Sequence, residues 1–202
     1  VIVSSMVALL DIKALKSVYT FDRLEFVFAI AAMLGVLVFG LLQGVFIGVA
    51  LTLLALLYRI SKPSITQLGR IPGTAEYTDM DRSPQNEITP GVLVLRIEGP
   101  LIFPNVARVR QEVKRLVKEG VKVELVVLSM RSAPYMDLSA TEMLSNLYDE
   151  LKAVGTSIRL AEALGACRDS ITKAGLNERF GELSPGMSVQ KVIDDWFEGK
   201  RE

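Results

Sequence analysis

The stretch FVFAIAAMLGVLVFGLLQGVFIGVALTLLALLY, from Phe26 to Tyr58, decides how the rest of the chain is organised. It contains no charged residue, and most of its positions are Leu, Ile, Val or Phe. On insertion scales each of these residues contributes about −0.3 to −0.6 kcal/mol at the bilayer centre. No charged residue in the stretch offsets this favourable free energy of insertion. The stretch is therefore predicted to lie in a membrane.

A single straight helix over this stretch would be about 50 Å long, whereas the hydrocarbon core of a bilayer is about 30 Å thick. Two shorter helices fit better, and the break is predicted at 40–44, where two glycines bracket the polar Gln43. Basic residues flank the stretch but are missing from the proposed turn: Lys13, Lys16 and Arg23 before it, and Arg59, Lys62 and Arg70 after it. By the positive-inside rule, both flanks are cytoplasmic.

Three glycines in the stretch, Gly40, Gly44 and Gly48, repeat at four-residue spacing. Small residues at this spacing let a neighbouring helix approach closely, so we predict helix packing at these positions. The alternative is that the glycines only form the turn and loosen the second helix.

Composition excludes several classes of function. Formal net charge is zero, so bulk charge does not indicate nucleic acid as a partner. The chain has no His, which removes the usual general base and the commonest metal ligand. A single cysteine, Cys167, excludes an internal disulfide and is interpreted as a packing residue. No enzyme activity, metal or cofactor is predicted.

Three parts are predicted along the chain: truncated transmembrane helices over 1–60, a connector over 61–90, and a soluble domain over 91–202. The opening residues VIVSSMVALL are apolar but short, and they are interpreted as the cut end of an earlier span of a larger polytopic protein. The connector is rich in Pro and Gly, with a short strand predicted at 76–79.

Strand and helix patterns alternate from Gly91 onward, which predicts an α/β fold with a mainly parallel or mixed sheet. Strands are predicted at 92–97, 101–103, 121–130 and 156–163, and helices at 105–119, 139–154, 166–174 and 189–197. Asn105 is the predicted cap of the first of these helices.

The turn after the central strand carries the candidate site, around Asp137, Ser139, Ala140 and Thr141. Ligands of open α/β sheets bind at the carboxyl ends of strands, and a helix N-terminus offers free amides there. Ser139 to Glu142 also matches a capping box, which would explain these residues without any switch. Phosphorylation of Ser139 is the alternative, because a phosphate would bring negative charge beside two carboxylates.

Four motifs that follow the hairpin carry a resemblance to a known family: LYRISKP at 57–63, LGRIPGT at 68–74, PGVLVLR at 90–96 and PLIF at 100–103. In this order they resemble the C-terminal part of sulfate permease (SulP) transporters, and the soluble half resembles their STAS domain. That fold is shared with bacterial anti-sigma-factor antagonists. Ser139 matches the residue that is phosphorylated in those antagonists, while Ala140 and Pro104 depart from the usual pattern.

The resemblance implies a secondary transporter for sulfate, bicarbonate, chloride or a dicarboxylate, with this region supplying gate-domain helices and a regulatory STAS domain. Its substrate site would lie upstream of Val1. The implied partners are the lipid bilayer, the upstream transmembrane domain, a second copy in a homodimer, and a cytosolic regulatory protein at the STAS domain. The implied location is an inner bacterial membrane with the STAS domain in the cytoplasm.

Two other functions stay open on the sequence. In one, the chain is a membrane-tethered signalling module of the anti-sigma-factor-antagonist type. In the other, the STAS domain only stabilises a dimer or aids folding and trafficking.

Overall fold

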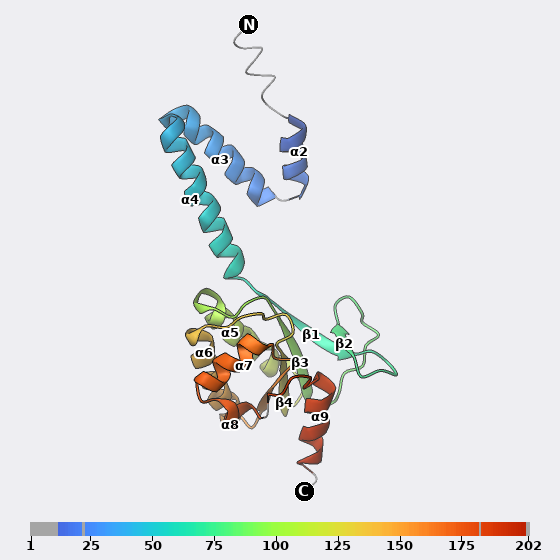
Figure 1. The fold of residues 1–202 in the computed structure, drawn as a ribbon. Coiled ribbons are helices and arrows are strands. Elements are labelled where there is room, and N and C mark those ends of the chain that lie inside the picture. The colour runs from blue at the N-terminus through green and yellow to red at the C-terminus, as the bar shows by residue number, and fades with distance from the viewer. Residues whose placement is uncertain (1–11, 22, 182, 201–202) are drawn as a thin grey trace. The chain divides into compact units, whose positions relative to one another are not determined.

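The computed structural model describes residues 12–21, 23–181 and 183–200 (Figure 1). The predicted cut end of an earlier span, at 1–10, lies outside the described residues. The chain divides into two compact units, one that extends to Tyr58 and one that starts at Arg59.

The first unit contains a helical hairpin. After α2 (Ile12–Phe21), helix α3 (Arg23–Phe39) and helix α4 (Leu41–Ile60) are separated by one residue, Gly40, whose φ of 91° suits glycine. The sequence had placed the break over 40–44, but Gly44 already lies within α4, where its amide donates to the Gly40 carbonyl. Among the described helices, only α4 is both long and apolar enough to cross a membrane.

Small residues bring α3 and α4 together. A Cβ added at Gly44 would lie 2.4 Å from the Cα of Val36, and one added at Gly48 would lie 3.1 Å from the Cβ of Ala32. Gly44 is buried, whereas most large apolar side chains of α4 are exposed. Helices α3 and α4 thus approach closely near the turn, and α4 presents an apolar exterior, as a helix in lipid would.

The second unit is built on a five-stranded mixed sheet with the order β2-β1-β3-β4-β5. Strands β3 (Val92–Glu98), β4 (Leu125–Ser129) and β5 (Ser157–Ala161) are parallel. Strand β1 (Ser64–Arg70) is antiparallel to both β2 (Tyr77–Asp79) and β3. The α/β class predicted from the sequence is therefore present.

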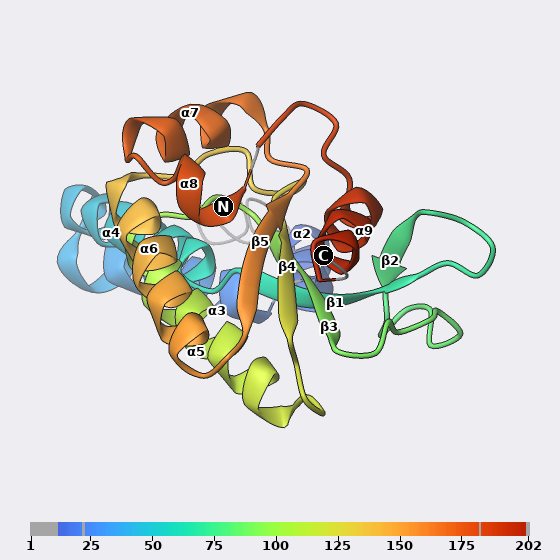
Figure 2. The same ribbon diagram turned by 90° about the horizontal axis from the view of Figure 1, so that it is seen from below.

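Helices cover both faces of this sheet (Figure 2). Helices α5 (Phe103–Glu119), α6 (Leu138–Ala153), α7 (Gly165–Lys173) and α8 (Asn177–Phe180) join one core, and α9 (Val189–Glu198) packs on the opposite face. Alternate residues of β3 enter the two cores: Leu95 lies in the first and Val94 in the second.

Two elements differ from the sequence prediction. The stretch 61–90, expected to be a connector, contributes β1 as well as the predicted short strand β2. The strand predicted at 101–103 is reduced to one bridge between Leu101 and Met136, because Phe103 begins α5. Pro104 favours this helix start, since a first turn needs no donor at that position.

Candidate regulatory site at the carboxyl edge of the sheet

Asp137 connects the first turns of two helices. Its Oδ1 accepts a hydrogen bond from the Ala140 amide at 2.9 Å, and its Oδ2 accepts one from the Phe103 amide at 2.8 Å. Those amides belong to the starts of α6 and α5, where backbone donors lack partners within the helix. One carboxylate therefore caps both helices.

The capping box predicted at Ser139 is wrong, because the helix starts earlier. Asp137 is the residue with extended backbone angles before α6, with φ −96° and ψ −177°. Ser139 is already the second helical residue, where its side chain no longer reaches an unpaired amide of the next turn.

Because Ser139 is not the cap, its hydroxyl has no hydrogen bond to any part of the chain that the structure describes. Ser139 is half-buried, so its hydroxyl can be reached from solvent. Thr141 differs on both counts: it is 3% exposed, and its Oγ1 donates to the Leu138 carbonyl at 2.8 Å. Ala140 is fully buried. Of the predicted site residues after Asp137, only Ser139 is partly exposed.

Exposed apolar side chains lie on the segments that meet at this edge. Phe103 opens α5 and is 74% exposed, and Leu138 opens α6 and is 71% exposed. Tyr135, in the loop before α6, is 53% exposed, and its carbonyl accepts from the Leu101 amide at 3.0 Å. Because the Phe103 amide bonds to Asp137, these exposed apolar side chains lie on segments next to Ser139.

The capping role predicted for Asn105 is wrong. Asn105 is not the cap of α5 but the third helical residue, fully buried, with its Oδ1 accepting from the Ile102 amide at 3.1 Å. Its Nδ2 donates to the carbonyls of Pro100 at 2.9 Å and Ile60 at 3.1 Å. Asn105 thereby fixes the loop before α5 to the last residue of α4, a contact between residues far apart in the sequence.

Cys167 packs in the first core, in agreement with its interpretation from the sequence. Its thiol donates to the Ala133 carbonyl at 3.1 Å, and burial raises its pKa. In residues 12–21, 23–181 and 183–200, no group of three or more acidic, His or Cys side chains is arranged to hold a metal ion.

The STAS domain family matches residues 83–191. This match covers more than half of the chain and includes β3, β4, β5 and the site around Asp137 and Ser139. The chain therefore belongs to the STAS domain family.

Comparison with known proteins extends the match to the hairpin. A probable sulfate transporter of Mycobacterium tuberculosis is 33% identical over 193 residues, which cover 95% of this chain and 34% of that protein. The probable sulfate transporter 4.2 of Arabidopsis thaliana is 27% identical, over 90% of this chain and 28% of that protein. The chain corresponds to the C-terminal, STAS-containing portion of the SulP/SLC26 transporter family, and it spans about a third of the length of these relatives.

A solved structure supports the fold over both units. The murine SLC26A9 anion transporter superposes with a TM-score of 0.78 at 20% identity, over 96% of this chain and 31% of that chain. These three relatives, two found by sequence and one by structure, are named as transporters.

Proposed function

We propose that this chain is the C-terminal portion of a secondary active transporter for anions of the sulfate, bicarbonate or dicarboxylate class. The observation that carries the proposal is the joined order of an apolar hairpin and a STAS unit, which relatives named as sulfate transporters match along almost the whole chain. The hairpin supplies gate-domain helices and dimer contacts, and the substrate site lies in membrane helices that precede it.

Transport by two polypeptides tests this proposal. The full-length protein of the source cell and the 202-residue chain are reconstituted separately in liposomes, and uptake of labelled sulfate, bicarbonate and succinate is measured against a control of empty liposomes. We expect uptake of at least one anion by the full-length protein and none by the chain alone. Uptake by the chain alone, or no uptake of any anion by the full-length protein, contradicts the proposal.

The α/β unit is proposed to be a cytoplasmic regulatory domain. Basic residues on both sides of the uncharged stretch support this orientation in a bacterial inner membrane. Because β1 begins at Ser64 and belongs to the sheet, we place the start of this domain there, before the boundary at 91 that the sequence suggested. A green fluorescent protein fused after Glu202 is expected to be fluorescent in cells, and a periplasmic alkaline phosphatase fusion is expected to be inactive.

A membrane-tethered signalling module is the second candidate, and it is favoured by the half-buried Ser139, whose hydroxyl bonds to no part of the chain that the structure describes. In that function, a kinase modifies Ser139 and the exposed apolar side chains around it bind a partner. The size of the native polypeptide separates the two candidates: an immunoblot band far larger than 22.2 kDa supports the transporter, and a membrane-bound band at that size supports the tethered module.

Phosphorylation itself is tested by mass spectrometry of the native protein, with Ser139→Ala and Ser132→Ala compared as variants. Ser132 is a matched control, since it is also a half-buried serine in the loop after β4. Loss of a phosphopeptide signal and of partner binding only in Ser139→Ala supports the switch, and unchanged partner binding contradicts it.

A further inference from the structure

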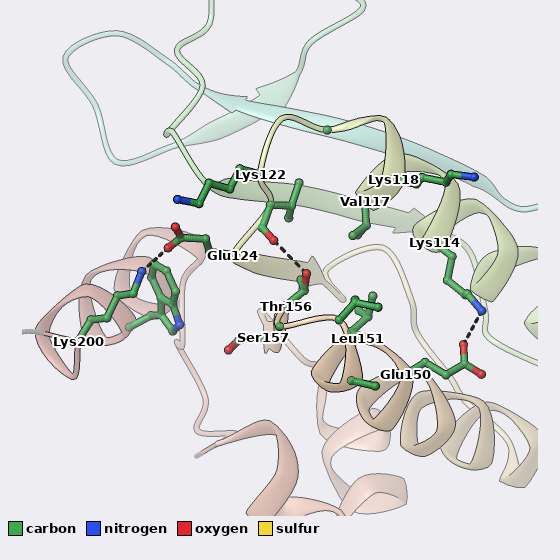
Figure 3. A pocket seen from close by; sticks show the side chains of 16 residues that line it. Lys114, Val117, Lys118, Lys122, Glu124, Glu150, Leu151, Thr156, Ser157 and Lys200 are labelled. Carbon is green, nitrogen blue, oxygen red and sulfur yellow. Dashed lines mark hydrogen bonds and ion pairs between the residues drawn. The ribbon is translucent and has the colours of Figure 1, made fainter.

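A groove with a volume of about 1080 Å³ lies at the amino edge of the parallel strands, at the opposite end of the strands from Ser139 (Figure 3). It is formed by the last turns of α5 and α6, by the loops that lead into β4 and β5, and by the end of α9. This volume is at the upper end of the range for small-molecule sites. Neither the motifs nor the proposed transport function accounts for it.

The floor of the groove is apolar. Val117 of α5 and Leu151 of α6 point toward its middle in Figure 3, and Trp196 of α9 is a further lining residue. Val154, at the end of α6, is 71% exposed on the rim. Leu151 is only 3% exposed, so the apolar surface open to water belongs to the half-buried Val117 and Trp196 and to Val154. Burial of such surface favours binding of an apolar group at about 25 cal/mol per Å².

The rim of the groove carries an excess of positive charge. Four lysines line it against two glutamates, and two of the lysines are neutralised: Lys114 pairs with Glu150 at 2.8 Å, and Lys200 pairs with Glu124. Lys118 and Lys122 are exposed and form no ion pair within the described residues. Two unpaired ammonium groups beside an apolar floor favour a ligand that is itself anionic.

Local contacts hold the groove in shape. The Thr156 hydroxyl donates to the Val123 carbonyl at 2.9 Å, so the loops that lead into β4 and β5 are tied together. Lys122 adopts a φ of 48°, a conformation unusual for a residue with a side chain. The Lys200 ammonium lies 4.6 Å from the centre of the Trp196 ring and pairs with Glu124, which links the end of α9 to the loop before β4.

We propose that this groove binds an amphiphilic anion, a molecule with an aliphatic or aromatic body of roughly six to ten carbons and one acidic head group. The body covers Val117, Val154 and Trp196. The head group pairs with Lys118 or with Lys122, whose ammonium groups point to opposite sides of the groove in Figure 3. A simple inorganic anion does not fit, because exposed ammonium groups bind small ions weakly and leave the apolar floor uncovered. A free metabolite and an anionic lipid share the required chemistry.

Trp196 is the single tryptophan of the chain and lines the groove, so its fluorescence reports occupancy directly. The full chain is reconstituted in phosphatidylcholine vesicles and titrated with octanoate. Octanol serves as the uncharged analogue of the same length, and acetate as the anion without a long aliphatic chain. We expect a saturable change with octanoate, binding at least tenfold weaker with octanol, and no change with acetate. Equal effects of octanoate and octanol overturn the proposal.

Two variants locate the site. Lys118→Ala/Lys122→Ala is expected to weaken octanoate binding about tenfold, as loss of both alternative charge contacts predicts. Val154→Asp adds an exposed negative charge on the rim without disturbing the core, and it is expected to weaken binding as well. The control, Arg82→Ala/Lys173→Ala, removes two exposed charges elsewhere and is expected to bind as the unmodified chain does. Equal weakening in the control, or none in the first variant, overturns the proposal.

A parallel experiment distinguishes a soluble ligand from a lipid. Vesicles that contain phosphatidylglycerol, without octanoate, are expected to leave Trp196 fluorescence unchanged if the ligand is a soluble molecule. A change that the Lys118→Ala/Lys122→Ala variant abolishes supports the same site with a lipid as its ligand. A change that persists in this variant, together with no response to octanoate, overturns the proposal. None of these results depends on transport.

Discussion

Polar and charged side chains have different roles at the two ends of the parallel strands. At the carboxyl edge, the side-chain oxygen and nitrogen atoms of Asp137 and Asn105 bond to backbone groups of the same unit, whereas the Ser139 hydroxyl bonds to no part of the chain that the structure describes. At the amino edge, charged side chains lie on the surface, and Lys118 and Lys122 form no ion pair within the described residues. Buried polar groups therefore hold the fold at one edge, while exposed charges at the other are available to a ligand.

Asn105→Ala is expected to have the largest effect on stability. It leaves the Ile102 amide and the Pro100 and Ile60 carbonyls without the side chain of Asn105, which is itself fully buried. The cost is about 1 to 3 kcal/mol for each group that water cannot reach. We expect the α/β unit to lose about 3 kcal/mol, measured by urea unfolding with Trp196 fluorescence. Asn146→Ala on the exposed side of α6 is the control. A loss below about 1 kcal/mol would show that water replaces the lost bonds.

Asp137→Ala is expected to have a smaller but clear effect. Two capped amides lose their acceptor, and removal of one N-cap typically costs about 1 kcal/mol, so the variant is expected to lose about 2 kcal/mol. Asp169→Ala, an exposed aspartate of α7, serves as the control in the same urea experiment. If both variants unfold at the same urea concentration, Asp137 does not hold the two helices.

The smallest effect is expected at the amino edge, in the pH dependence of stability. Lys200 lowers the pKa of Glu124 through a hydrogen bond and its charge. A carboxyl with a lower pKa in the folded state stabilises the fold above its unfolded pKa of about 4.3, and this stabilisation disappears as pH falls through the folded value. We expect Glu124→Gln to unfold at slightly lower urea than the unmodified chain at pH 7 and at the same urea at pH 3.

Glu142→Gln is the matched control for that experiment, because Glu142 is an exposed glutamate of the carboxyl edge with no ion pair in the described chain. It is expected to show no difference at either pH. A pH-dependent difference in Glu142→Gln as large as in Glu124→Gln would contradict the assignment to the Lys200 pair.

Local patterns in the sequence predicted the elements whose signal is contained in a short segment. The uncharged stretch with its glycines predicted the hairpin, and the alternation after Gly91 predicted the α/β class. Strand β1 was missed because Pro63, Gly69 and Pro72 lie in or beside it, and such residues indicate a loop when pairing with β3 is not known.

The sequence predicted where the site lies but not which residue caps α6. Asp137 and Ser139 are both good N-cap residues two positions apart, and the contact that favours Asp137 comes from the Phe103 amide, which is distant in sequence. The roles of Asn105 and of the groove depend likewise on segments that only the fold brings together. The exposed lysines gave no signal, because such residues are common on any soluble surface.

The shared carboxylate of Asp137 also has a consequence for local motion. Because α5 and α6 depend on one acceptor, fraying of either first turn breaks a contact of the other, and the two helix starts open as one cooperative unit. The amides of Phe103 and Ala140 are then expected to exchange with deuterium at similar rates, although they lie 37 positions apart in the sequence.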